Sequence, residues 1–266
     1  MSKAAIVTGA ARGIGAATVM SLATAGWNVM AVDRCCDDPR LPYRLGTRED
    51  LAEVVARAGV LAGREGSIHS VVGDATSSED MSGAIERAER VFGGVDAVIA
   101  IAGVIAGGVP LWEMPSGQQD AVMDANLNSV LVASRIGIPA LLRRPAPRAG
   151  RFVAVASAAA TRGLPMLAAY CAAKAGVTGL IRALAAELRG TGVTANAVSP
   201  GSTATPILDE SARLYGLESA EAFSSQQPIS RLIRPDEVAA TIVWLVDSAP
   251  DALTGATVPV DGGLSL

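Results

Sequence analysis

Histidine and cysteine, side chains typical of protein metal sites, are nearly missing from this chain of 266 residues. His69 is the only histidine, and we interpret it as a surface or packing residue rather than a catalytic one. The three cysteines are odd in number, and Cys35 and Cys36 are adjacent, so a disulfide framework is not expected. No His/Cys cluster has metal-ligand spacing. The sequence therefore predicts no metal.

Charge is also scarce. Charged residues make up 18% of the chain, the formal net charge is −4, and there is no block of like charge, so nucleic acid is not an expected partner. The most apolar segment, Ala97–Trp112, is short and broken by glycine and proline, which indicates a buried strand and a loop rather than a membrane span. The N-terminus lacks the layout of a signal peptide. We expect a cytoplasmic protein without a membrane partner.

Hydrophobic residues, by contrast, make up half of the chain. Apolar, β-branched runs alternate with alanine-rich helical patterns, without a composition shift or an internal repeat. Such strands predict a parallel sheet covered by helices on both faces, so we expect a single α/β domain over residues 1–266, a doubly wound Rossmann-type fold with seven parallel strands. The expected strands are Ala4–Thr8, Asn28–Val32, Ile68–Val72, Ala97–Ile101, Gly150–Ala156, Thr194–Val198 and Thr257–Val260. The expected helices are Gly13–Ala25, Arg48–Leu61, Ser78–Phe92, Ser116–Leu142, Ala168–Arg189 and Pro235–Val246.

A glycine-rich turn follows the first strand. Gly9, Gly13 and Gly15 remove Cβ atoms where a backbone turns tightly and approaches a pyrophosphate at a helix N-terminus. Asp33 ends the second strand, where an acid accepts hydrogen bonds from an adenosine ribose. A carboxylate there disfavours a 2′-phosphate, so NAD is expected rather than NADP, although the cations Arg12 and Arg34 argue the other way. The alternatives are an ordinary strand–helix turn and a solvated aspartate.

Tyr170 and Lys174 stand four residues apart on a strongly helical segment, which puts both on one face. An ammonium beside a phenol lowers the pKa of the phenol, as an acid–base group working near neutral pH requires. The alternative is a packed tyrosine and a solvated lysine. Lys174 is, however, one of only two lysines, the other being Lys3. Ser157 ends the fifth strand, where a hydroxyl can meet a substrate oxygen; the alternative is a plain strand-end serine.

Taken together, these motifs resemble the short-chain dehydrogenase/reductase superfamily from end to end. They are "TGAARGIG" at Thr8–Gly15, "VVGDAT", "ANL", the Tyr170-x-x-x-Lys174 pair, "SPG" and the terminal "TGATVPVDGG". The resemblance implies that Tyr170 exchanges a proton with an alcohol or carbonyl and that Ser157 hydrogen-bonds the same oxygen. Lys174 would lower the Tyr170 pKa and hold the nicotinamide ribose, and Asn126 would hold a water in the proton relay.

The resemblance also implies a set of cofactor contacts and an NAD-dependent alcohol dehydrogenase or carbonyl reductase. One departure is that "AIAG" at Ala100–Gly103 replaces the usual "NNAG", so Ile101 supplies no side-chain amide. Contacts to adenosine through the backbone of Ala102 and Gly103 would survive. The full set of expected cofactor contacts is Gly9, Arg12, Gly13, Ile14, Gly15, Asp33, Arg34, Asp74, Ala75, Ala102, Gly103, Tyr170, Lys174, Pro200, Thr203 and Thr205.

The segment Arg34–Arg48, called the insert below, is longer than the two to six residues usual for such a connection. Its two prolines and its tyrosine indicate an ordered loop, and it begins where the adenosine ribose would lie. With "AIAGVIAGGVPLWE" it resembles the mycofactocin-dependent subgroup, which implies a clamp over non-exchangeable NAD and mycofactocin as the electron acceptor. The alternative is a tolerated surface insertion in an ordinary NAD(P)-exchanging reductase.

The substrate is expected to be a small, hydrophobic secondary alcohol or ketone. Selectivity is expected from Val104–Trp112, Ala158–Leu167 and Thr205–Arg231, with an irregular substrate lid over about residues 203–234. The resemblance implies a homotetramer, in which Ser116–Leu142 and Ala168–Arg189 would pair; their apolar faces would equally fit the sheet. Other functions considered are a catalytically silent nucleotide-binding scaffold and a sugar-nucleotide epimerase or dehydratase.

Overall fold

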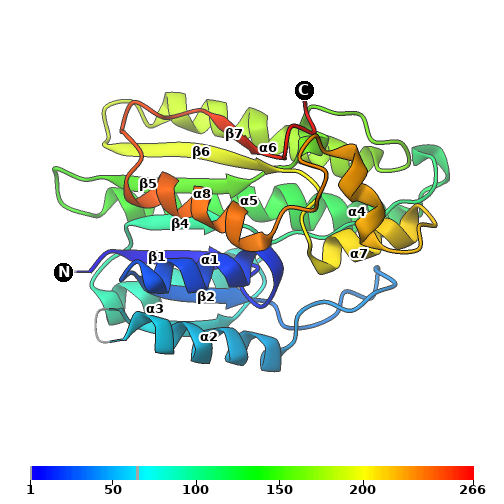
Figure 1. Ribbon diagram of the computed structural model, residues 1–266. Helices are drawn as coiled ribbons and strands as arrows, with labels where there is room; N and C mark the ends of the chain where they lie inside the picture. Colours follow the sequence, from blue (N-terminus) through cyan, green and yellow to red (C-terminus); the bar gives the residue numbers. More distant parts are fainter. Residues whose placement is uncertain (1, 64–65) are drawn as a thin grey trace.

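The computed structural model describes residues 2–63 and 66–266. Its core is one sheet of seven parallel strands in the order β3-β2-β1-β4-β5-β6-β7, which confirms the predicted Rossmann-type fold (Figure 1). Strands β1, β4, β5 and β6 are buried along their whole length, as parallel strands covered on both faces must be. The strands are β1 Ala4–Thr8, β2 Asn28–Asp33, β3 Ile68–Val72, β4 Ala97–Ala100, β5 Gly150–Val155, β6 Val193–Pro200 and β7 Thr257–Val260.

Helices cover both faces of the sheet (Figure 1). One apolar core lies between the sheet and helices α1, α2 and α8, and a second lies between the sheet and α3, α5 and α6. The helices are α1 Gly13–Thr24, α2 Arg48–Ala62, α3 Ser78–Phe92, α4 Ser116–Met123, α5 Ser129–Leu142, α6 Ala168–Glu187, α7 Pro206–Leu214 and α8 Pro235–Asp247. Short helical turns are η1 Leu111–Glu113, η2 Asp124–Asn128, η3 Ala158–Ala160 and η4 Ala220–Gln226.

Strands are added to one side of β1 up to β3 and to its other side from β4 onward, so the order of the strands reverses between β3 and β4. Strand β1 pairs with β2 on one side and with β4 on the other, so the connections after these strands diverge at their carboxyl ends. In open α/β sheets this switch point is where ligands bind. Residues that follow β1, β4, β5 and β6 therefore meet at one edge of the sheet.

The predicted single helix Ser116–Leu142 is interrupted in the structure. The π-helical turn η2 lies between α4 and α5 and widens the backbone spiral at Asn126. By length and composition the run is apolar enough to cross a membrane, but half of its most apolar window is buried inside the fold. In Figure 1, α5 lies on one face of the sheet, the position of an ordinary packed helix.

The lid, residues 203–234, is more regular than the sequence predicts. Pro206 begins helix α7, a position at which the missing N–H of proline costs no hydrogen bond. The turn η4 follows later in the lid. The two ends of the lid are joined to each other, because Thr203 forms an isolated bridge with Ile233. The irregular loop is thus a helical flap over the carboxyl ends of the strands.

Candidate active site

One cavity of about 740 Å³ opens at the carboxyl ends of the strands, within the usual range for ligand pockets. Every expected catalytic and cofactor-contact residue lines it, whereas of the expected selectivity segment Val104–Trp112 only Val104 and Ile105 do. At one end are the glycine turn, Asp33 and Asp74; at the other are Ser157 and Tyr170. Also on its wall are Ile14, Ala75, Ala102, Gly103, Asn126, Lys174, Pro200, Thr203 and Thr205.

The glycine turn is tight enough to exclude side chains at three positions. A Cβ on Gly15 would lie 1.9 Å from the Gly9 carbonyl oxygen, and one on Gly9 would lie 2.8 Å from the Ala102 Cα. Gly9 and Gly13 also have φ of +67° and +56°, which favour glycine. The turn leads directly into the N-terminus of α1, whose N–H groups attract an anion. It fits a dinucleotide pyrophosphate.

Asp33 is held in a fixed orientation at the end of β2. Its two carboxylate oxygens each accept one backbone hydrogen bond, from Ala11 N and from Cys35 N, both at 3.0 Å. The remaining lone pairs are available to a ribose diol. Arg34 is turned away from this carboxylate, since it pairs with Asp38 at 3.2 Å and approaches Asp74 at 3.9 Å. Of the two cations that argued for NADP, Arg34 is therefore neutralised by acids, whereas Arg12 donates to the Arg44 carbonyl.

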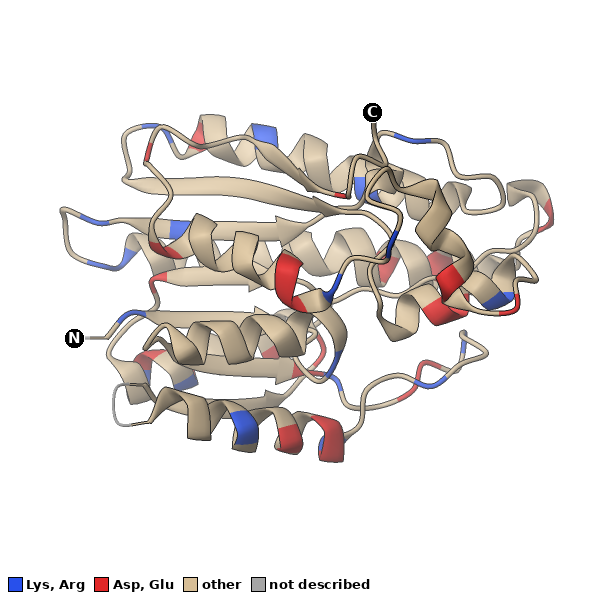
Figure 2. Cartoon of the chain, in the orientation of Figure 1, with Lys and Arg blue, Asp and Glu red and all other residues tan. Residues whose placement is uncertain are grey.

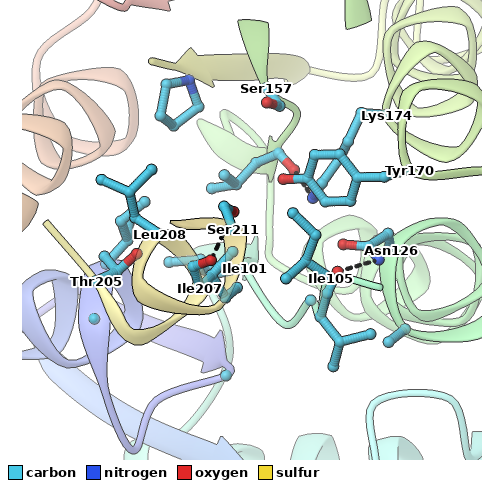
Figure 3. Close-up of a pocket in the computed structure, with 18 of the residues that line it drawn as sticks. Ile101, Ile105, Asn126, Ser157, Tyr170, Lys174, Thr205, Ile207, Leu208 and Ser211 are labelled. Carbon is cyan, nitrogen blue, oxygen red and sulfur yellow. Dashed lines mark hydrogen bonds between the residues drawn. The ribbon is translucent and has the colours of Figure 1, made fainter. Parts of the chain in front are cut away.

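Ser157, Tyr170 and Lys174 lie together on one side of the cavity, opposite Thr205, Ile207 and Leu208 of the lid (Figure 3). The Lys174 ammonium lies 5.8 Å from the centre of the Tyr170 ring and donates a hydrogen bond of 2.8 Å to the carbonyl of Val155. The N-terminus of α6 and the end of β5 thus bring the three polar groups to one point.

The pKa values of this pair differ from the sequence-based expectation. Burial raises the pKa of Tyr170 to about 12, with the Ser157 hydroxyl beside it acting in the opposite direction. Burial lowers the pKa of Lys174 to about 8. Lys174 is bound to a carbonyl and lies over the ring rather than at the phenol oxygen, so it does not depress the tyrosine pKa in this arrangement.

Asn126 is buried in the π-helical turn η2. Its side-chain amide donates to the carbonyls of Val104 and Val122, both at 2.8 Å, and one of these bonds is drawn in Figure 3. Its Oδ1 is buried and accepts no hydrogen bond from the described residues. A Cβ on Gly103 would lie 2.6 Å from this oxygen and 3.6 Å from Lys174 Nζ. An unsatisfied oxygen near an ammonium is suited to a bound water.

The insert is packed onto the cavity rim. Leu41 and Leu45 are buried in a small apolar cluster with residues of α4 and α6 and with partly buried Tyr170. The Tyr43 hydroxyl accepts a hydrogen bond of 2.9 Å from Ile105 N. Gly46 lies beside Asp33, because a Cβ there would lie 3.5 Å from the Asp33 carboxylate. The insert thus reaches from the adenosine end to the tyrosine end.

Charges of both signs fix the conformation of the insert (Figure 2). Asp38 is only 4% exposed and accepts hydrogen bonds from the Arg40 and Arg34 side chains. Arg40 also donates to Asp124 of η2 at 2.7 Å, and Arg12 of the glycine turn donates to the Arg44 carbonyl at 2.9 Å. These pairs join the insert to both ends of the cavity.

The substitution of "AIAG" for the asparagine-rich motif is compensated locally. The Thr8 hydroxyl accepts hydrogen bonds from the backbone N–H groups of Ile101 and Ala102, at 3.1 and 3.2 Å. This ties β1 to the segment after β4 without an amide side chain. Cavity residues that the sequence did not name individually include Arg40, Gly46, Asp124, Arg162 and Leu264; of these, Arg162 lies in the predicted selectivity segment Ala158–Leu167. Only the unusual length of the insert hinted at the first two.

Among the described residues, no group of His, Cys, Asp and Glu is arranged to hold a metal ion. The three cysteines are free, with Cys35 and Cys171 partly buried and Cys36 exposed. His69 forms a hydrogen bond with Ser67 at 3.0 Å and packs on Phe92, and it does not line the cavity.

The sheet order, the glycine turn and the polar wall define an oxidoreductase of the Rossmann type. A family model described as enoyl-(acyl carrier protein) reductase matches residues 9–265. The chain belongs to the short-chain dehydrogenase/reductase superfamily, as its motifs predict.

Individual relatives span the same length. Cis-4-hydroxycyclohexanecarboxylate dehydrogenase of Sinomonas cyclohexanicum is 34% identical, with 98% of this chain and 96% of the relative covered. A 3-oxoacyl-[acyl-carrier-protein] reductase of Thermotoga maritima is 31% identical, covering 98% and 97%. The crystal structure of carveol dehydrogenase from Mycobacterium avium in complex with NAD is 30% identical, with a TM-score of 0.90 and coverage of 98% and 97%.

Proposed function

We propose that this protein is an NAD-dependent alcohol dehydrogenase or carbonyl reductase, with Tyr170 as its general acid–base. The observation that carries the proposal is that Asn126, Ser157, Tyr170 and Lys174 share one cavity with a glycine turn and Asp33. Asp33 would bind the adenosine ribose and disfavour a 2′-phosphate, so NAD is the expected cofactor. The NAD-bound carveol dehydrogenase relative supports this choice.

The residues of this chain perform the proton part of the reaction. Bound NAD supplies the acceptor for the hydride that leaves the carbinol carbon. Ser157 hydrogen-bonds the substrate oxygen, and Tyr170 takes the hydroxyl proton as the carbonyl forms. With the cofactor held by the glycine turn and Asp33, the Lys174 ammonium would lower the pKa of the buried phenol, so that Tyr170 accepts the proton as a phenolate. A water held by Asn126 Oδ1 and Lys174 passes the proton outward.

The insert is proposed to act as a clamp that keeps NAD in the cavity between turnovers. Gly46 lies beside Asp33, and the insert is anchored to the glycine turn by Arg12 and to η2 by Arg40. A cofactor that stays bound must be reoxidised in place, and mycofactocin is the acceptor that the subgroup resemblance implies. The electrons then leave in a second half-reaction at the same site.

The substrate is proposed to be a small, hydrophobic secondary alcohol or its ketone. The lid and the loop after η3 contribute the apolar wall, including Leu164, Leu208 and Phe223. The relative that acts on cis-4-hydroxycyclohexanecarboxylate supports a secondary alcohol on a six-membered ring. The lid would close over this substrate. The protein is further proposed to be a single catalytic domain that works as a cytoplasmic homotetramer.

Cofactor retention and a Tyr170→Phe variant test the proposal. The purified protein is desalted exhaustively and denatured, and released NAD is measured against protein. About one equivalent supports the clamp, and assays then use an artificial electron acceptor with cyclic secondary alcohols. Little retained NAD favours the ordinary exchanging reductase. Tyr170→Phe is expected to lose at least about 100-fold in kcat, the typical contribution of a general acid–base. Unchanged activity would contradict the assignment of Tyr170.

A further inference from the structure

The substrate half of the cavity has an uneven distribution of charge. The acidic residues that line the cavity are Asp33, Asp74 and Asp124, all of which lie on the cofactor and insert side. From Val155 to Leu264, the lining includes two cations, Arg162 and Lys174, and no acid. Lys174 belongs to the catalytic group. Arg162 has no role in the reaction described above.

Arg162 differs from the other arginines on the cavity wall. Arg34 and Arg40 are each paired with carboxylates, and Arg12 is bound to the insert. Arg162 forms no ion pair with the described residues. Its one side-chain hydrogen bond is a donation from NH1 to the Leu264 carbonyl at 2.6 Å. Most of its five N–H donors are therefore free to bind another acceptor.

The position of Arg162 is fixed from two sides. Its backbone N–H donates a hydrogen bond of 2.9 Å to the carbonyl of Ala158, the residue that follows Ser157. Its partner Leu264 lies in a C-terminal tail that Asp261 holds by accepting hydrogen bonds from Gly263 N and Ser265 N, both at 3.0 Å. Arg162 is an exposed residue at the cavity wall, and its hydrogen bond to the Leu264 carbonyl holds one end of the guanidinium there. Beside it, a Cβ on Gly163 would meet nothing within 4 Å.

We propose that Arg162 is an anion-binding subsite, and that the substrate is a secondary alcohol or ketone carrying a carboxylate at its end remote from the reacting carbon. The apolar wall takes the hydrocarbon body, Ser157 and Tyr170 take the reacting oxygen, and the fork of Arg162 takes the carboxylate in a bidentate pair. This inference rests on the proposed function, because it names the substrate class of the same site.

The first test uses turnover. The probes are 4-hydroxycyclohexanecarboxylate and its uncharged methyl ester, with the protein carrying its NAD. The ratio of kcat/KM for the acid to that for the ester is expected to fall at least tenfold in Arg162→Gln, mainly through KM. Arg162→Lys, which keeps the charge but not the fork, is expected to retain an intermediate ratio. Arg57→Gln, on the exposed face of α2 and paired only with Glu53, is the matched control.

The second test uses binding and does not depend on turnover. Calorimetry compares cyclohexanecarboxylate with cyclohexanecarboxamide on the same NAD-carrying protein. The carboxylate is expected to bind at least tenfold more tightly, and this preference is expected to disappear in Arg162→Gln and persist in Arg57→Gln. A preference that is absent, or that survives in Arg162→Gln, overturns the subsite.

The two proposals fail in different ways. If Arg162-dependent carboxylate binding is found while no alcohol is oxidised, the anion subsite stands and the dehydrogenase function fails. If alcohols are oxidised but the acid-to-ester ratio is the same in Arg162→Gln, the function stands and the subsite fails. A change in Tm of Arg162→Gln, measured alongside, reports whether the tail contact to Leu264 also supports folding.

Discussion

Arg40 and Asp124 form an ion pair of 2.7 Å that connects the insert to the turn carrying Asn126. Arg40 binds Asp38 of the insert at the same time, at 2.8 Å. Asp38 is buried and Asp124 is partly exposed. Because Arg40 binds both carboxylates, it fixes the long insert to a helical turn that lines the cavity. The element over the cofactor and the element that positions the proton relay are thereby joined by one side chain.

Removing this connection is expected to release the cofactor. In Arg40→Ala, the insert loses its bond to η2 and Asp38 loses its principal partner, at a cost of about 1–3 kcal/mol for a charged hydrogen bond. NAD retained after desalting is expected to fall more than threefold, while Arg57→Ala retains the wild-type amount. Full retention in Arg40→Ala would show that the ion pair is not part of the clamp.

The same pair predicts how stability depends on acid. The hydrogen bonds from Arg40 hold the pKa of Asp38 well below its ordinary value of 3.8. A carboxyl whose folded pKa is depressed stabilises the fold above its unfolded pKa and loses that contribution as the pH falls further. Urea unfolding is therefore expected to show stability falling below about pH 4, less steeply in Arg40→Ala. Identical slopes for both proteins would contradict this.

We expect the buried ammonium of Lys174 to lower the free energy of unfolding of the protein. Burial lowers its pKa from 10.5 to about 8, so the unfolded chain binds more protons between these values and stability rises with pH in that window. Lys174→Met is expected to stabilise the protein at pH 7 by about 1–3 kcal/mol while abolishing turnover. Thermal unfolding and kcat, measured on the same sample, check both effects. A variant less stable than wild type at pH 7 would refute the stability effect.

Gly103 is expected to be essential for the position of Asn126. A Cβ there would lie 2.6 Å from Asn126 Oδ1, so Gly103→Ala must displace the amide or fill the space beside it. We expect kcat to fall roughly 10–100-fold, because proton transfer is worth about 10²–10⁴-fold. Gly59→Ala is the control, since nothing lies within 4 Å of a Cβ there and its helix gains about 0.5–1 kcal/mol. Equal kcat in both variants would show that Gly103 is not needed to position Asn126.

Among the residues that the structure describes, one side-chain hydrogen bond joins the lid to the loop after η3. The Tyr215 hydroxyl donates to the Pro165 carbonyl at 2.7 Å. Tyr215→Phe removes about 0.5–1.5 kcal/mol, so KM is expected to rise two- to tenfold and α7 to exchange its amide hydrogens faster. Ser225→Ala, whose hydroxyl makes only a weak bond within η4, serves as the control. Unchanged exchange in α7 would contradict the lid.

The sequence predicted the sheet well because its signals are local. Apolar runs such as Ala4–Thr8 and capped helices such as Arg48–Ala62 depend on neighbouring residues, and motif spacing located the polar wall. The π-helical turn at Asn126 was not predictable, since a continuous helical pattern crosses it. The segment Ala158–Leu167, which carries Arg162, was predicted to contribute to selectivity. The contact of Arg162 with Leu264 and the Arg40–Asp124 pair were not predictable, because each joins residues far apart in the chain.

The two lysines differ in exposure, so reagents that modify amines can distinguish between them. Lys3 has a half-exposed side chain at the N-terminal end of β1, paired with Asp247. Lys174 is buried in the cavity with a pKa of about 8, so a sizeable share of it is the neutral, nucleophilic amine near that pH. An acylating reagent can therefore modify Lys174 only when the lid and the insert open to admit it. The extent of Lys174 modification would report this opening, and Lys3 would serve as the internal reference in the same mass spectrum.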